Sequence, residues 1–409
     1  MNISITAGKL SGIINAPPSK SMAHRMLICA GLSANQNCTI TGISDSDDVT
    51  ATLSCLSALG ATFRKEGSTV HMTGIDIRAI QHDSTLNCHE SGSTLRFLIP
   101  LCLMNNAKSN HTLTGTPKLL SRPLNVYENI CSEQNIFYKH EENQLTVCGQ
   151  LASGEYKIPG NISSQFISGL LFALPLCEHD SKIDIIPPIE SRSYLDLTIE
   201  ALQTFGIDVV WQSERTLYIK GGQSYIAPLQ TSVEGDYSNA AFFAALKLFG
   251  NDIQITGLSE TSHQGDKAYI RYFEQLNKGV PTIHIGDCPD LGPVLMAVAA
   301  AKNGAVFTGT KRLKIKESDR GNAMACELEK FGVSVKVHDD SIIVYPIAFH
   351  APTAPLCGHN DHRIVMALST LLTLTGGTIE GAEAVKKSLP DYFDLLKNLG
   401  AEVLIHEVN

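Results

Sequence analysis

The sequence predicts an α/β protein made of six repeated units that form two similar domains. Helical segments, most of them apolar runs with a period near 3.6, open at Ser19, Ser91, Ser163, Asp236, Asp290 and Asp361. Successive openings lie 72, 72, 73, 54 and 71 residues apart. A period of this length is typical of repeated supersecondary units, so we expect one unit per interval, the fifth being shortened. Each opening carries Ser or Asp, the residue types that cap helix N-termini.

A second set of helices is expected between the first, with starts near Asp47, Arg122, Ser193, Gly265, Ser318 and Pro390. Glycines follow the expected ends of four of them, at positions 60, 206, 332 and 400, where a left-handed residue ends a helix. Alternating segments such as 207–210 and 333–337 follow and predict strands. Each unit is therefore expected to contain two helices and several strands.

The repeats fall three and three along the chain. This predicts a first domain of residues 18–225 and a second of residues 1–17 plus 226–409. A strand at Ile3–Ile5 precedes the first unit and needs a sheet partner, which we expect in the second domain.

Composition narrows the class of protein. Of the 409 residues, 43% are hydrophobic and 18% are charged, which is typical of a globular chain. The net charge of −9 argues against a surface that attracts nucleic acid. The N-terminus lacks the pattern of a signal peptide, and the longest apolar run, at 166–177, is far shorter than the roughly 20 residues that span a bilayer. The eleven cysteines form no C-x-x-C pair, so we expect reduced thiols in a cytoplasmic protein.

Basic residues gather at the expected helix openings of this acidic protein. Lys20, Ser21 and Arg25 share the first turns of one helix, where cations oppose the helix dipole unless an anion is bound. Taken alone, each such segment also suits an ordinary capped helix with a solvated surface. Taken together, the cations at equivalent ends predict a cleft between the domains for substrates rich in phosphate and carboxylate. These cations are Lys20, Arg25, Arg96, Arg122, Lys316, Arg320, Arg363 and Lys387.

Ten segments in a fixed order carry a family resemblance: PPSKSMAHR, SDSDD, GSTLRF, SRPL, SSQF, SRSYLD, VEGDYSNAAFF, KIKESDR, NDHR and KKSLPDYF. In these segments the chain resembles the 5-enolpyruvylshikimate-3-phosphate (EPSP) synthase family over almost its whole length. The resemblance implies two similar domains, each of three βαβαββ units with helices inside a ring of sheets. It also implies transfer of the enolpyruvyl group of phosphoenolpyruvate to the 5-hydroxyl of shikimate 3-phosphate, without a metal or cofactor. We expect a monomer with no nucleic-acid or membrane partner.

The resemblance also implies roles for individual residues. Asp290, Glu317 and Lys20 are expected to act in catalysis, with Arg96, Glu90 and His362 in support. The residues expected to bind shikimate 3-phosphate are Lys20, Ser21, Arg25, Ser163, Ser164, Gln165, Ser191, Tyr194, Asp290 and Lys316. The residues expected to bind phosphoenolpyruvate are Lys20, Gly92, Arg122, Gln165, Arg320, Arg363 and Lys387.

Three positions depart from the family pattern: Glu90 and Arg312 stand where Asn is common, and Phe97 where Pro is frequent.

Alternative functions also remain. A UDP-N-acetylglucosamine enolpyruvyl transferase would carry a reactive Cys in the loop before an Arg-Pro, but the loop at 114–123 has none. A non-catalytic anion-binding protein on the same scaffold could lose the carboxylates at 290 and 317. Cys357 and His359 with His362 offer a metal alternative that lacks a fourth ligand at clear spacing.

Overall fold

The computed structural model describes residues 1–104, 109–347 and 349–406. The chain forms two compact units, one of residues 20–233 and one of residues 1–19 plus 234–409. The boundaries differ from the expected ones at 17/18 and 225/226. Residues 226–233 belong with the first three repeats because Gln230–Ser232 forms a strand (β14) that pairs in parallel with Asn37–Thr41 (β3).

The unit of residues 20–233 contains three four-stranded sheets, ordered β14-β3-β5-β4, β6-β7-β9-β8 and β10-β11-β13-β12. In each sheet the first pair of strands is parallel and the next two pairs are antiparallel. The remaining strands are β4 (Thr62–Glu66), β5 (Thr69–Thr73), β6 (Ser84–Asn87), β7 (His111–Thr114), β8 (Phe137–Glu141), β9 (Gln144–Cys148), β10 (Glu155–Pro159), β11 (Ser181–Ile186), β12 (Val209–Ser213) and β13 (Thr216–Ile219).

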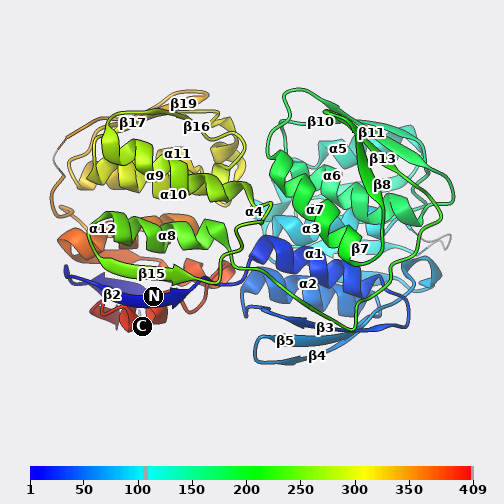
Figure 1. Cartoon of the computed structure of the whole chain (residues 1–409). Coiled ribbons are helices and arrows are strands. Elements are labelled where there is room, and N and C mark those ends of the chain that lie inside the picture. Colours follow the sequence, from blue (N-terminus) through cyan, green and yellow to red (C-terminus); the bar gives the residue numbers. More distant parts are fainter. Residues whose placement is uncertain (105–108, 348, 407–409) are drawn as a thin grey trace. The chain divides into compact units, whose positions relative to one another are not determined.

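The helices of this unit alternate with its strands, as a βαβαββ repeat requires (Figure 1). They are α1 (Lys20–Gly31), α2 (Asp47–Ala58), α3 (Gly92–Leu101), α4 (Pro117–Leu120), α5 (Asn125–Glu133), α6 (Ser164–Ala173) and α7 (Arg192–Thr204), with 3-10 turns η1 (Ile77–Ala79) and η2 (Leu174–Leu176).

The unit of residues 1–19 plus 234–409 repeats the same strand pattern. Its sheets are ordered β16-β17-β19-β18 and β20-β21-β1-β22, with the pair β15-β2 in addition. The N-terminal strand β1 (Asn2–Ile5) pairs with β21 and β22, so the chain start completes a sheet built from its end. The other strands are β2 (Ser11–Asn15), β15 (Asp252–Thr256), β16 (Thr282–His284), β17 (Ala305–Thr308), β18 (Val335–Val337), β19 (Ser341–Val344), β20 (Leu356–Cys357), β21 (Gly377–Glu380) and β22 (Val403–His406).

The helices of this second unit are α8 (Tyr237–Leu248), α9 (Tyr269–Lys278), α10 (Gly292–Ala301), α11 (Arg320–Lys330), α12 (His362–Thr375) and α13 (Tyr392–Asn398). Its 3-10 turns are η3 (Gly265–Ala268), η4 (Pro289–Leu291), η5 (Lys311–Ile315) and η6 (Ala382–Lys387). Within the unit, α8 packs on β15 and beside α12 (Figure 1).

Each unit has a core made by helices that are buried on nearly every side. In α3 and α6 almost every residue is buried, and the same holds for α10 and α12. A helix that is apolar all round needs cover all round, and here the sheets and the outer helices supply it. At Gly169 in α6 an added Cβ would lie 2.5 Å from the carbonyl oxygen of Arg96 in α3. The absence of a side chain there lets the two core helices approach closely.

Candidate active site

Lys20 opens α1 and pairs with Asp48 in the first turn of α2. The Lys20 Nζ donates a hydrogen bond of 2.8 Å to Asp48 Oδ2, and both side chains are mostly buried. A buried cation next to a carboxylate holds a defined position, in contrast to a solvated surface lysine. The ion pair therefore fixes the Lys20 ammonium where two helices begin.

Arg25 lies one turn further along α1 and is almost fully buried. Its Nε donates to Thr198 Oγ1 at 2.9 Å, its Nη2 to the carbonyl of Tyr194 at 3.0 Å and its Nη1 to the carbonyl of Ser21 at 2.6 Å. Burial lowers the pKa of Arg25 to about 10, against opposing contributions from Tyr194 and Cys29. Arg25 thus ties α1 to α7 in addition to any contact with a ligand.

Gly92, Arg96, Arg122 and Gln165 form a second group, which we call the Gly92 cluster. Arg96 Nη1 donates to Gln165 Oε1 at 2.8 Å, and Gln165 Nε2 donates to Ser93 Oγ at 2.9 Å. A Cβ added at Gly92 would lie 2.9 Å from Arg122 Nη1 and 3.3 Å from Arg96 Nη1. Two guanidinium groups therefore face the bare backbone at the start of α3, an arrangement suited to an anion.

The third helix opening of this unit presents hydroxyl groups. Ser163 caps α6 by accepting a hydrogen bond of 3.3 Å from the backbone N–H of Gln165, and Ser164 is the first residue of the helix. Ser191 precedes α7 with a left-handed φ of 58°, which is uncommon for a residue with a side chain. Tyr194 lies in the first turn of α7, and its carbonyl accepts the bond from Arg25.

In the other unit, three cations converge on one carboxylate. Asp290 Oδ1 lies 2.8 Å from Arg320 Nη1 and 3.1 Å from Lys316 Nζ, and Asp290 Oδ2 lies 3.2 Å from Arg363 Nη2. Arg320 also donates to Glu317 Oε2 at 2.7 Å. Asp290 contacts all three cations and Glu317 shares one of them, so the cationic groups are held at fixed positions around the Asp290 carboxylate. We call these five residues together with Asp361 the Asp290 cluster.

Asp361 positions other members of the Asp290 cluster through hydrogen bonds. It is fully buried, and its Oδ2 accepts hydrogen bonds of 2.9 Å from both Arg320 Nε and the Ser318 hydroxyl. Its Oδ1 accepts from the backbone N–H of Arg363 at 3.0 Å, which caps α12. A single carboxylate therefore orients one arginine and the helix that carries another.

Charge and burial shift the pKa values within this group. Burial by itself would raise the pKa of Asp290, but Arg363, Lys316 and Arg320 hold it well below its usual range. Burial lowers the pKa of Lys316, opposed by Asp290 and assisted by Arg312 and Arg320. Asp290 is thus an ionised carboxylate and a weak base in the ligand-free protein.

Two further contacts position the segment before α12. Lys387 Nζ donates to the carbonyl of Asn360 at 2.7 Å. The buried carboxylate of Glu327 in α11 accepts from the backbone N–H of Cys357 at 2.9 Å and lies 2.8 Å from His359 Nε2. Glu327 therefore anchors the turn that leads to Asp361 and Arg363, and it engages two residues of the metal alternative considered above.

A family model described as EPSP synthase (3-phosphoshikimate 1-carboxyvinyltransferase) matches residues 5–281 and 273–396. The chain belongs to the EPSP synthase family. Two relatives named 3-phosphoshikimate 1-carboxyvinyltransferase bear this out. The Clostridium kluyveri protein is 39% identical, with 98% of each chain covered, and a Clostridium perfringens protein is 40% identical, with 97% of each covered.

Solved structures agree with the EPSP synthase fold. An EPSP synthase from Acinetobacter baumannii matches with a TM-score of 0.80 at 23% identity, covering 99% of this chain and 100% of that one. The enolpyruvyl transferase NikO from Streptomyces tendae matches with a TM-score of 0.75 at 15% identity and covers 98% of both chains. The expected fold of repeated α/β units in two domains is therefore confirmed. The family match also favours an EPSP synthase over the UDP-N-acetylglucosamine enzyme.

Some expectations about helix starts were wrong, and the differences matter for the site. Asp290 does not cap α10, which begins at Gly292, so its carboxylate points to cations instead. Ser318 does not cap α11: Asp319 does, by accepting from the N–H of Asn322, and Ser318 donates to Asp361. Arg122 opens no helix but lies between α4 and α5. The side chains of Asp290 and Ser318 thus contact charged residues distant in sequence and do not cap their own helices.

The three departures from the EPSP synthase pattern have identifiable neighbours. The Thr116 hydroxyl donates to Glu90 Oε1 at 3.5 Å. Phe97 packs edge-on against Phe172, with its ring 5.2 Å from the Arg25 guanidinium carbon. Arg312 is buried and donates to the carbonyl of Gly286 at 3.3 Å.

Sequence reasoning assigned no role to Asp48 or Glu327 and only a helix cap to Asp361. In the structure Asp48 contacts Lys20, Asp361 contacts Arg320, and Glu327 anchors the turn before Asp361. The acidic run at 44–48 was one available signal for Asp48. His362 was expected in support and is buried at the first position of α12.

In the described ranges, no group of three His, Cys, Asp or Glu residues is arranged to hold a metal ion. Every described helix is also too short or too polar to cross a bilayer.

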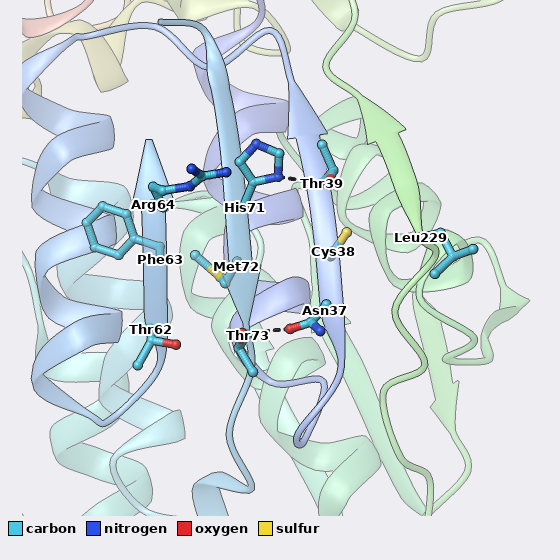
Figure 2. Close-up of a pocket in the computed structure, with 10 residues that line it drawn as sticks. All are labelled: Asn37, Cys38, Thr39, Thr62, Phe63, Arg64, His71, Met72, Thr73 and Leu229. Carbon is cyan, nitrogen blue, oxygen red and sulfur yellow. Dashed lines mark hydrogen bonds between the residues drawn. The ribbon is translucent and has the colours of Figure 1, made fainter. Parts of the chain in front are cut away.

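A groove of about 550 Å³ lies on the sheet β14-β3-β5-β4, away from the residues just described. Figure 2 shows side chains of adjacent strands along it: Thr39 bonded to His71, and Thr73 donating to Asn37 at 2.7 Å. These bonds join strands of one sheet and leave the groove outside the candidate site.

Proposed function

We propose that this chain transfers the enolpyruvyl group of phosphoenolpyruvate to the 5-hydroxyl of shikimate 3-phosphate and releases phosphate. The observation that carries the proposal is the convergence of Lys316, Arg320 and Arg363 on Asp290, next to Glu317. Relatives about 40% identical over nearly the whole chain carry the name of this activity. Both substrates are polyanions, so they need several fixed cations.

The proposed ligands of shikimate 3-phosphate lie mainly in the unit of residues 20–233, at the starts of α1, α6 and α7. Hydroxyl groups and a cation at helix N-termini suit a phosphate monoester. These proposed ligands are Lys20, Ser21, Arg25, Ser163, Ser164, Gln165, Ser191 and Tyr194, with Asp290 and Lys316 for the ring hydroxyls.

For phosphoenolpyruvate we propose guanidinium and ammonium ligands, because the molecule carries a phosphate and a carboxylate. In the unit of residues 20–233 these are Lys20, Arg122, Gln165 and the backbone of Gly92. In the other unit they are Arg320, Arg363 and Lys387. Arg96, Glu90 and His362 are proposed to support these ligands; for Arg96 the support is its bond to Gln165.

The chemistry is an addition followed by an elimination. The 5-hydroxyl oxygen bonds to C2 of phosphoenolpyruvate while its proton passes to a base, and C3 gains a proton from an acid. In the second step the C2–O bond to phosphate breaks, C3 loses a proton and the enol ether forms. We propose Asp290 as the base and Glu317 as the acid, with Lys20 available to either step.

The ion pairs of the free protein suggest how the base is activated. Asp290 holds its low pKa because Arg363, Lys316 and Arg320 surround it. An anionic substrate that binds these cations offsets part of their charge and thereby raises the pKa of Asp290. Binding would then convert a weak base into a stronger one at the moment when the 5-hydroxyl arrives.

The proposal is tested by measuring phosphate release in the presence of both substrates and of each alone. We expect release only with both, and none when UDP-N-acetylglucosamine replaces shikimate 3-phosphate. Binding of both substrates without any turnover would instead support a non-catalytic anion-binding protein. We further propose that the chain acts as a cytoplasmic monomer without nucleic-acid or membrane partners. Light scattering of the active protein measures its molar mass and so tests whether it is a monomer.

A further inference from the structure

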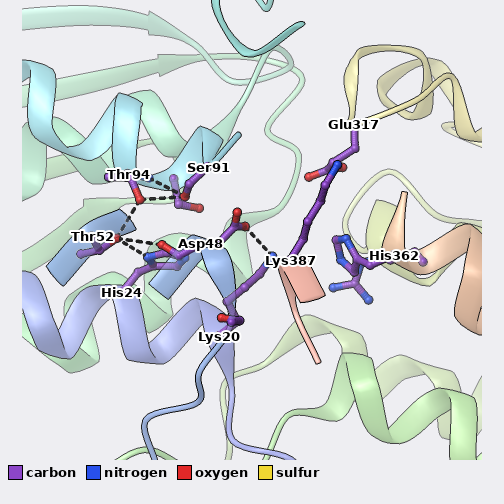
Figure 3. A network of polar contacts seen from close by, with 12 residues as sticks. Lys20, His24, Asp48, Thr52, Ser91, Thr94, Glu317, His362 and Lys387 are labelled. Carbon is purple, nitrogen blue, oxygen red and sulfur yellow. Dashed lines mark hydrogen bonds and ion pairs between the residues drawn. The ribbon is translucent and has the colours of Figure 1, made fainter. Parts of the chain in front are cut away.

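Four buried side chains form an unbroken polar chain beneath the start of α1. His24 Nδ1 lies 2.7 Å from Thr52 Oγ1, which lies 2.7 Å from Thr94 Oγ1. The Thr94 hydroxyl donates to Ser91 Oγ, again at 2.7 Å. All four residues are completely inaccessible to solvent. Figure 3 shows the bonds running from His24 through Thr52 and Thr94 to Ser91, which we call the polar chain.

The polar chain lies one helical turn below the residues proposed to bind substrate. His24 follows Lys20 by four residues in α1, and Thr52 follows Asp48 by four in α2. Residues four apart share a helix face, so α1 and α2 are joined by two successive contacts. The outer contact is the Lys20–Asp48 ion pair, and the inner one is the His24–Thr52 hydrogen bond.

The inner contact also continues to the third helix. Thr52 bonds to Thr94 in the first turn of α3, and Thr94 bonds to Ser91, the cap of that helix. Gly92, which faces two guanidinium groups, directly follows Ser91. The polar chain therefore links the backbone at Gly92 to the helix that carries Lys20.

The protons along the polar chain have one consistent order. Because Thr94 donates to Ser91, the proton between Thr52 and Thr94 belongs to the Thr52 hydroxyl, which therefore donates to Thr94 at 2.7 Å in preference to the Asp48 carbonyl at 3.5 Å. Thr52 in turn accepts from N–H at His24 Nδ1. Burial, then the charges of Lys20 and Arg25, lower the pKa of His24 well below its usual value, so the imidazole is neutral. A neutral ring with its proton on Nδ1 fits this order.

The polar chain adds little to the stability of the core, but it fixes the relative positions of helices α1, α2 and α3. A buried hydrogen bond contributes little net free energy to folding, whereas apolar contacts of the same shape contribute as much or more. Apolar helices can slide by fractions of an ångström with little cost, but three successive bonds of 2.7 Å cannot all persist if one helix shifts.

We propose that Thr52 and His24 are positioning residues for the reaction, which hold Lys20 and the backbone at Gly92 in a fixed mutual register. The inference rests on the proposed function, because the register matters only if both groups contact substrate. Neither residue is proposed to touch substrate.

The experiment compares Thr52→Val with Thr52→Ser. Valine keeps the shape and removes the hydroxyl, whereas serine keeps the hydroxyl. We expect Thr52→Val to lower kcat/KM by about ten- to a hundredfold, with a raised KM for phosphoenolpyruvate. Thr52→Ser should stay within about threefold of the unmodified protein. A role in stability alone would reduce the amount of active protein and leave KM unchanged.

The matched control is Thr373→Val in α12, which removes another buried hydroxyl, bonded at 2.7 Å to the carbonyl of Thr370. It should keep its KM values while losing comparable thermal stability. If Thr52→Val does not fold, His24→Asn against His24→Leu provides the second comparison, because only asparagine can donate to Thr52. The asparagine variant should retain the larger kcat/KM.

The inference fails if Thr52→Val, assayed well below its melting temperature, keeps KM and kcat within twofold of the unmodified protein. It fails equally if the serine variant is as impaired as the valine variant, or if His24→Leu matches His24→Asn. A failure of the proposed function is separately visible, because the unmodified protein would then release no phosphate from the two substrates.

Discussion

Arg320 Nε donates a hydrogen bond of 2.9 Å to Asp361 Oδ2, and neither side chain has more than 1% of its surface exposed. The two residues are 41 positions apart, and each also serves another partner in the Asp290 cluster. A buried charge pair of this kind depends strongly on both members, because removal of one leaves the other uncompensated.

Asp361→Asn tests this pair. The amide can still cap α12, but it cannot neutralise Arg320, so we expect a loss of about 3–5 kcal/mol in the free energy of unfolding. We also expect a higher KM for phosphoenolpyruvate. Asp319→Asn, which changes only the cap of α11, should cost at most about 1 kcal/mol. Urea denaturation measures the free energy of unfolding of both variants. Equal losses in the two variants would contradict a special role for Asp361.

Gly92→Ala should disturb the Gly92 cluster without unfolding the protein. The new Cβ would lie 2.9 Å from Arg122 Nη1, so this flexible side-chain end must move. We expect the KM for phosphoenolpyruvate to rise about tenfold, the loss of one good contact, and the melting temperature to change little. Gly8→Ala is the control, because nothing lies within 4 Å of its Cβ position. An unchanged KM would remove Gly92 from the proposed site.

Glu317→Gln separates a proton donor from a structural partner of Arg320. Glutamine keeps the size and a hydrogen-bond acceptor but cannot deliver a proton. We expect kcat to fall by about 10²–10⁴ while shikimate 3-phosphate still binds normally. Glu329→Gln, on an exposed part of α11, should leave kcat unaltered. A Glu317→Gln variant with more than a tenth of normal kcat would assign the acid role to Lys20 in place of Glu317.

Arg25→Ala should affect stability as well as binding, because the structure gives Arg25 three hydrogen bonds within the protein. Bonds from a charged group are worth about 1.5–3 kcal/mol each, so a loss of several kcal/mol is expected. The KM for shikimate 3-phosphate should rise more than that for phosphoenolpyruvate. Arg192→Ala, at an exposed position of α7, is the control for both measurements. Equal changes in the two KM values would argue against a contact with one phosphate.

Asp266 provides a prediction about pH. Burial, together with the charge of Asp290, raises its pKa to about 6, although Arg363 opposes the shift. The folded protein then holds this proton more tightly than the unfolded chain does. The resulting stabilisation is full below about pH 4 and is lost as pH rises through about 6. Asp266→Asn should therefore be more stable than the unmodified protein at pH 7–8, by up to about 3 kcal/mol, with the difference vanishing near pH 4. Melting curves over this range decide the sign, and a variant that is less stable at pH 8 would show that the ionised carboxylate is needed.

The repeats, most of the helix caps and the helix ends could be read from the sequence alone. Ser91, Ser163, Asp236 and Asp361 cap the helices that they were expected to open, and Gly60, Gly206, Gly332 and Gly400 all have positive φ. These features depend on hydrogen bonds and backbone conformations within a few residues. A local pattern of residue types is therefore enough to predict them.

Only the tertiary structure decided how distant segments complete sheets and neutralise charges. Strand β14 joins the sheet of the first repeat, which moves the domain boundary to 233/234, and β1 joins a sheet at the chain end. Asp290 and Ser318 were expected to cap helices, but their side chains contact partners at least 26 residues away in sequence. Such partners are brought together by burial of the core helices, and the strength of a contact between charged groups depends on that burial. The sequence shows which residues carry charge, whereas the fold decides which of them meet.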